Sequence, residues 1–218
     1  MDPYTYKNGV LKNKLGIKDY NELNKAEASI GFVKLINVDS IKPEYFNAEF
    51  IKDIHKHIFE DIFEWAGNFR TTALFKEELV LNGMTVPYSE VSKIEQDLNR
   101  VLNDLNSTVW QNMDAEQIAF TFARKIALLW RVHPFRDGNT RTILSFAYIF
   151  ARDYGFEFDM EEFTKQLRRK MDDEGKVIDY SIRDKFVVAC LDESPQVGPL
   201  AYVFKNAIKN CDEKKIKK

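Results

Sequence analysis

The sequence predicts an all-α fold with one small β-hairpin. Along most of the 218 residues, apolar side chains recur at the three- and four-residue spacing of a helix. One short stretch instead alternates between apolar and polar residues, as strands do. No repeat, long linker or break in composition divides the chain. We therefore expect a single domain over 1–218, with a core at about 42–155 and helical extensions at 1–41 and 156–218.

The first two helices are predicted from their apolar faces. Residues 20–39 carry Leu23 and Ile30 on one side of a helix. A second pattern opens at Pro43 and runs to Gly67, where glycine suits the left-handed conformation of a C-cap.

The alternating stretch follows directly after the second helix. Residues 69–75 and 79–83 flank the charged run Lys76-Glu77-Glu78, which favours a short hairpin. Because an isolated two-stranded ribbon is marginal in water, it needs a helical body beneath it or a third strand from a partner. Helical spacing then resumes in six further segments, at 89–105, 114–131, 140–154, 160–171, 176–191 and 199–210.

Composition excludes several classes of protein. Hydrophobic residues make up 44% and charged residues 30%, which is typical of a globular domain. The formal charge of −2 argues against direct nucleic-acid binding, and the two cysteines cannot define a disulfide framework. No apolar run opens the chain, so we expect a cytoplasmic protein with no membrane partner. Export by a route without a signal would leave no trace in this pattern.

The stretch HPFRDGNTR, residues 133–141, separates two helices with strongly apolar patterns. Gly138 and Asn139 tolerate positive φ, so the backbone N–H groups there can form a concave ring. Those groups continue into the positive end of the next helix, which favours anions. Arg141, one turn into that helix, can reach the same anion.

The same loop carries groups suited to catalysis. Asp137 offers a hard oxygen ligand for Mg²⁺ beside a phosphate, and His133 titrates near neutral pH and can take a proton from a hydroxyl. Phe135 is expected to anchor the loop in the core. A histidine before proline or an Asp-Gly turn is commonly structural by itself. Together they indicate metal-assisted transfer from a nucleotide to a hydroxyl.

This loop resembles the signature of the Fic family (Fic/Doc superfamily), H-x-F-x-[D/E]-G-N-G-R-x-x-R. The stretch IFEDIFEWAGNFR, residues 58–70, is similar to the helix that leads into the flap of that family, and the hairpin after it resembles the flap itself. The opening DPYTYKNGVLKNKLGIKD is similar to the start of bacterial Fic proteins. The resemblance covers most of residues 2–155.

The resemblance implies a Fic-type helical bundle that adenylylates proteins, moving AMP from ATP to a Tyr, Thr or Ser hydroxyl with Mg²⁺. His133 would be the general base, and Asp137 would hold Mg²⁺ between the α- and β-phosphates. Nucleotide contacts would come from Gly138, the backbone and side chain of Asn139, Thr140 and Arg141. The flap residues Thr71, Thr72, Ala73, Leu74 and Phe75 would pair with an extended segment of the target protein.

Two positions depart from the signature. Thr140 replaces its second glycine, and Leu144 replaces its final arginine, the usual γ-phosphate clamp. The Doc branch also lacks that arginine, so Doc-like phosphoryl transfer stays open, as does a binding scaffold without catalysis. The inhibitory pattern [S/T]-x-x-x-E-[G/N] of many Fic proteins is missing, because its nearest match, SIKPEY at Ser40, contains a proline. Regulation would then come from a separate antitoxin-like chain, or be unnecessary if the intrinsic rate is low.

The other two histidines suggest no metal site. His55 and His57 lie two residues apart and cannot share a helical face. We interpret both as structural or surface residues.

Overall fold

The central helix of the fold is α4, Ala115–Val132. It begins at a capping box, in which the Asp114 carboxylate accepts the N–H groups of Glu116 and Gln117 while the Gln117 side chain returns to the Asp114 N–H. Apolar side chains cover most of its circumference, so α4 is buried by neighbours on several sides. These neighbours are α3 (Ile94–Asn106), α5 (Asn139–Asp153), α7 (Ile182–Ala189) and α8 (Gly198–Ala207).

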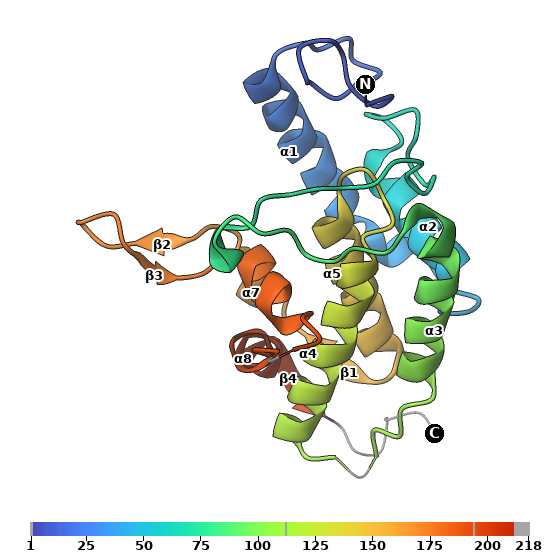
Figure 1. Ribbon diagram of the computed structural model, residues 1–218. Coiled ribbons are helices and arrows are strands. Elements are labelled where there is room, and N and C mark those ends of the chain that lie inside the picture. Colours follow the sequence, from blue (N-terminus) through green and yellow to red (C-terminus); the bar gives the residue numbers. More distant parts are fainter. Residues whose placement is uncertain (1, 112, 194, 212–218) are drawn as a thin grey trace.

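The N-terminal half covers the other side of α5. Helix α2, Ala48–Phe59, packs against α5 and is capped by the Asn47 side chain, which accepts the Phe50 N–H. Helix α1, Tyr20–Ile36, contacts α2 and lies at the edge of the molecule (Figure 1). The buried apolar residues form one continuous cluster that includes every helix named so far.

The computed structural model describes residues 2–111, 113–193 and 195–211, and it confirms the predicted fold class. Two small antiparallel sheets accompany the helices, and the β2–β3 hairpin projects away from the bundle (Figure 1). No helix in these ranges is long and apolar enough to cross a membrane. The remaining elements are the 3-10 helices η1 (Val38–Ser40), η2 (Leu79–Leu81) and η3 (Val91–Lys93), helix α6 (Glu161–Thr164), and strands β1 (Phe156–Phe158), β2 (Lys170–Met171), β3 (Val177–Asp179) and β4 (Ile208–Cys211).

The hairpin predicted at residues 69–83 is wrong as a pair of strands. Residues 70–78 form no strand, although Glu78 exchanges backbone hydrogen bonds with Met84 and Gly83. The second half forms η2 followed by a left-handed turn at Asn82 and Gly83. The side chains nevertheless alternate: Thr71, Ala73 and Phe75 are exposed, whereas the residues between them are partly covered. The period-two pattern therefore predicts the alternation of side chains correctly, but it does not say whether the segment has a hydrogen-bonded partner strand.

The terminal extensions are less helical than expected. Residues 2–18 form turns and one bridge between Thr5 and Leu11. The helix predicted at 160–171 shrinks to α6, because the Asp172 carboxylate accepts the N–H groups of Glu174 and Lys176 and folds a turn between β2 and β3. Strand β4, which pairs with β1, replaces the end of the last predicted helix. Helix α2 likewise begins five residues after Pro43 and ends at Phe59, before a series of turns to Gly67.

Candidate active site

Two residues with positive φ shape the loop between α4 and α5. His133 ends α4 with φ of 49°, and Gly138 precedes α5 with φ of 76°. A Cβ atom on Gly138 would lie 2.3 Å from the ring of Phe59, so this position requires glycine for space as well as for conformation.

The first turn of α5 is left open to an anion. Gly138 has no side chain to cap the helix, so the N–H groups of Asn139, Thr140 and Arg141 have no intrahelical acceptor. The Asp137 carboxylate accepts the Gly138 N–H at 2.6 Å, and its other oxygen makes no hydrogen bond to the described residues. The helix end thus combines free donors with the positive end of the helix dipole.

A cavity of about 110 Å³ lies over this helix end. It is smaller than the ~300–1,000 Å³ that encloses a whole drug-sized ligand, so it has room for phosphates rather than for a complete nucleotide. The structure brings the predicted residues His133, Asp137, Gly138, Asn139, Thr140 and Arg141 together around it, along with two residues that the sequence did not indicate, Lys76 and Arg183.

His133 is held as a neutral base at this cavity. Its Nδ1 lies 3.2 Å from the Trp130 carbonyl, which can only accept, so Nδ1 carries the proton and Nε2 is the acceptor. Lys76 Nζ lies 3.5 Å from Nε2. Burial, and then the charge of Lys76, hold the pKa of His133 well below its usual value.

Buried residues brace the loop from within. Phe135 is fully buried and stacks on His55 with ring centroids 3.8 Å apart. The Asn139 side chain accepts the Phe135 N–H at 2.9 Å and donates to the Phe135 carbonyl at 2.8 Å. Its expected contact with an α-phosphate stays a prediction, whereas its role in closing the loop is visible here.

His55 supports the loop from α2. Its Nδ1 accepts the Gly67 N–H at 2.9 Å, so Nε2 carries the proton and donates to the Asp137 carbonyl at 3.1 Å. Burial lowers the pKa of His55 to about 3, which keeps the ring neutral and this pattern fixed. The structural interpretation of His55 agrees with these contacts, although no sequence pattern indicates that they reach the loop.

Arg70 is a second brace that the sequence did not reveal. Its Nε donates to the His133 carbonyl at 2.9 Å, and its backbone N–H donates to the Pro134 carbonyl at 2.8 Å. Further guanidinium donors reach the carbonyls of Thr72 and Ser89. One buried arginine thus ties the loop between α4 and α5 to the extended segment at residues 70–78. A lone arginine in a sequence carries no signal of such a role.

Arg141 is held from both sides. Its guanidinium donates to the Glu27 carboxylate of α1 at 2.8 Å and lies over the Phe59 ring, 4.4 Å from its centroid. Burial raises the pKa of Glu27, against the opposing effect of Arg141. Glu27 does not fit the inhibitory pattern [S/T]-x-x-x-E-[G/N], because Leu23 stands four residues before it; its contact with Arg141 depends on how α1 packs.

The two departures from the signature have visible structural consequences. The Thr140 hydroxyl accepts the Trp130 indole N–H at 2.9 Å and so joins the start of α5 to the end of α4. Leu144 is buried in the core cluster. The position of the signature's final arginine is therefore occupied by a packing residue.

Asp137 is the candidate ligand for a magnesium ion. The described residues contain no group of three or more side chains that could hold a metal by themselves. A single carboxylate suits Mg²⁺, which commonly binds one or two carboxylates and completes its shell with water and substrate phosphates.

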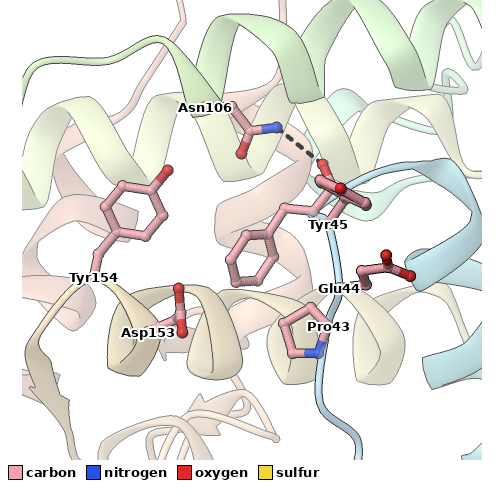
Figure 2. A pocket seen from close by; sticks show the side chains of 7 residues that line it. Pro43, Glu44, Tyr45, Asn106, Asp153 and Tyr154 are labelled. Atoms are coloured by element: carbon pink, nitrogen blue, oxygen red, sulfur yellow. Dashed lines mark hydrogen bonds between the residues drawn. The ribbon is translucent and has the colours of Figure 1, made fainter. Parts of the chain in front are cut away.

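A larger hollow of about 400 Å³ lies elsewhere, between α5, the end of α3 and the chain before α2. Figure 2 shows Asn106 donating to the Phe46 carbonyl across it, with Glu44, Asp153 and Tyr154 around its rim. Its lining has two carboxylates and no cationic side chain. It is more spacious than the cavity at α5 but lacks the cationic donors that bind a phosphate strongly.

Fold and loop together define a helical protein whose anion-receptive loop joins two core helices beside a buried histidine. Residues 45–151 match the model of the Fic/DOC family. The chain is 30% identical over 161 residues to the probable protein adenylyltransferase y4lH of Sinorhizobium fredii, covering 72% of this chain and 79% of that protein. The chain belongs to the Fic/DOC family.

Two Bartonella proteins extend this comparison. Protein adenylyltransferase VbhT of Bartonella schoenbuchensis is 31% identical over 168 residues, covering 76% of this chain. The chain spans 34% of the length of VbhT. The crystal structure of BepC, a VirB-translocated effector of Bartonella tribocorum with bound AMPPNP, superposes with a TM-score of 0.66 at 25% identity and covers 94% of this chain and 95% of that one.

Proposed function

We propose that the chain transfers AMP from ATP to a Tyr, Thr or Ser hydroxyl of a target protein. The observation that carries this proposal is the single cavity that joins the Nε2 side of a neutral histidine to the open N-terminus of α5. His133 as a proton acceptor and the first-turn N–H groups of α5 as phosphate-binding donors would then face the same reacting centre. The protein adenylyltransferase names of the relatives support this assignment.

The proposed reaction is a displacement at the α-phosphorus. Phosphate oxygens accept hydrogen bonds from the first-turn N–H groups of α5 and from Arg141. His133 Nε2 takes the proton of the target hydroxyl as its oxygen bonds to the α-phosphorus, and pyrophosphate leaves. Asp137 would hold Mg²⁺, which would neutralise phosphate charge.

The extended segment at residues 70–78 is the proposed docking site for the target. The backbone N–H and C=O groups of Ala73, Leu74 and Phe75 make no hydrogen bond within the described chain. A strand with unpaired groups can accept another extended segment by β-augmentation. This arrangement also fits the absence of a ladder partner in the described part of the protein.

Two labels on ATP test the reaction. We would incubate the protein with Mg²⁺, cell lysate and ATP labelled at either the α- or the γ-phosphate. AMP transfer predicts protein-bound label from the α position alone, whereas label from the γ position alone would establish Doc-like phosphoryl transfer instead. No label, together with no ATP, ADP or AMP binding by calorimetry, would favour the scaffold.

A further inference from the structure

Two cationic side chains that the signature motif does not provide also line the cavity over α5. Lys76 comes from the extended segment at residues 70–78 and Arg183 from α7, and both line the cavity together with the motif loop. Position 144 is a leucine buried in the core, so the final arginine of the signature is absent from this cavity.

Arg183 is fixed in place by a buried carboxylate. It forms a bidentate pair with Glu78, with N–O distances of 2.5 and 2.6 Å. Glu78 is only 1% exposed and also accepts the Tyr88 hydroxyl at 3.1 Å. A guanidinium has five donors, so this pair leaves Arg183 with donors for a further anion.

Lys76 differs from the buried Lys185 in its surroundings. Lys185 has its Nζ within 2.7 Å of the Asp179 carboxylate, the Gln166 side chain and the Tyr180 carbonyl. Lys76 has no carboxylate within 4.0 Å among the described residues, and its nearest polar contact is His133 Nε2. Burial lowers the pKa of Lys76. An ammonium without a counter-ion in such a place is costly unless an anion binds there.

We propose that Lys76 and Arg183 form the subsite for the terminal phosphates of a nucleoside triphosphate, in place of the arginine that Leu144 replaces. The identity of the nucleotide rests on the proposed function, whereas the subsite itself rests on this cavity. The α-phosphate would lie toward the α5 N-terminus and Arg141. The leaving pyrophosphate would lie toward Lys76, whose charge stabilises it as it departs.

Binding of inorganic pyrophosphate and of AMP to the purified chain tests the subsite by calorimetry. Lys76→Met should weaken pyrophosphate binding at least about tenfold, the loss of one charge-assisted contact, and leave AMP binding within about twofold. Lys205→Met on α8, a half-exposed lysine that does not line the cavity, is the matched control and should change neither. Undetectable pyrophosphate binding by the unaltered chain would overturn the proposal.

A thermal unfolding curve separates this role from a structural one. A ligand-binding Lys76 is a buried charge without a partner, so Lys76→Met should leave the midpoint unchanged or raise it. A lower midpoint with equal losses of AMP and pyrophosphate affinity would overturn the proposal. The double variant E78Q/R183Q, which removes both charges of the buried pair, should also weaken pyrophosphate binding.

These outcomes are independent of the transfer reaction. If no label is transferred from ATP but pyrophosphate binding depends on Lys76, the subsite stands and the proposed function fails. If AMP is transferred but Lys76→Met leaves pyrophosphate binding unchanged, the proposed function stands and the subsite fails.

Discussion

The two walls of the cavity are built in opposite ways. In the motif loop, residues 133–141, backbone and side chains are held by buried partners from several elements, including Phe59, Arg70 and His55. In the extended segment at residues 70–78, the central backbone groups have no partner within the described chain, and Phe75 is 70% exposed. The motif loop is held by hydrogen bonds and packing, whereas the extended segment has unpaired backbone N–H and C=O groups.

This difference indicates a division of roles. Chemistry at a phosphate needs donors and a base held in one geometry, which buried bracing provides. Recognition of an extended target needs unpaired backbone groups and exposed side chains, which bracing would remove. Apart from Lys76, which belongs to the extended segment but also lines the cavity, substitutions in the two walls should therefore fail in different assays.

Loss of the base should give the largest effect. His133→Asn keeps a residue that tolerates positive φ, so the loop should remain folded while the proton acceptor is lost. We expect the transfer rate to fall about 10²–10⁴-fold, with ATP affinity little changed. Single-turnover transfer and calorimetric binding measure the two quantities. A normal rate would remove His133 from the mechanism.

Matched glycine substitutions compare the walls directly. Gly138→Ala creates strain at positive φ and a clash with Phe59, which together should cost about 2–5 kcal/mol of unfolding free energy. Gly83→Ala near the extended segment has the same strain, but its Cβ would meet no atom within 4 Å, so we expect about 1–2 kcal/mol. Denaturant unfolding measures both. Equal losses would contradict the claim that the loop is the tightly packed wall.

Acid should destabilise the loop through its neutral histidines. The pKa values of His133 and His55 are lowered in the folded chain, so below about pH 6.5 the unfolded chain binds more protons. The unfolding free energy should therefore fall as pH decreases from 6.5 to 5, by about 1.4 kcal/mol per pH unit for each histidine. Denaturant titrations at several pH values measure this slope. His133→Asn should remove about half of it, and an unchanged slope would mean that His133 is protonated in the fold.

A change at the exposed wall should have the smallest effect on stability. Phe75→Ser removes an exposed side chain and should change the unfolding free energy by less than about 0.5 kcal/mol. It should reduce labelling of the target protein without altering ATP binding, because the site of docking is separate from the nucleotide. Phe120→Ser, an exposed phenylalanine on α4, is the control and should leave labelling unchanged. Weaker ATP binding by Phe75→Ser would contradict the separation of the two walls.

Local patterns explain how much the sequence could predict. The predicted helices at 114–131 and 140–154 match α4 and α5 to within a residue or two, because long apolar periodicity is a local signal. The loop residues also converge, because HPFRDGNTR contains its own turn and helix start. Both features depend on residues that are neighbours in the chain.

Features that depend on packing between distant segments were out of reach. Glu27 meets Arg141 across 114 positions, and Arg183 meets Glu78 across 105. No spacing rule relates such residues. The hairpin prediction at residues 69–83 failed for a related reason. Alternation predicts the conformation of a strand, but a ladder requires a partner strand, which the described chain does not provide.

A crystal structure with a non-hydrolysable ATP analogue and Mg²⁺ tests the central claim most directly. The account predicts an α-phosphate within hydrogen-bond distance of the first-turn N–H groups of α5 and the terminal phosphates beside Lys76. A nucleotide in the larger hollow of Figure 2, or phosphates with no contact to α5, would contradict it.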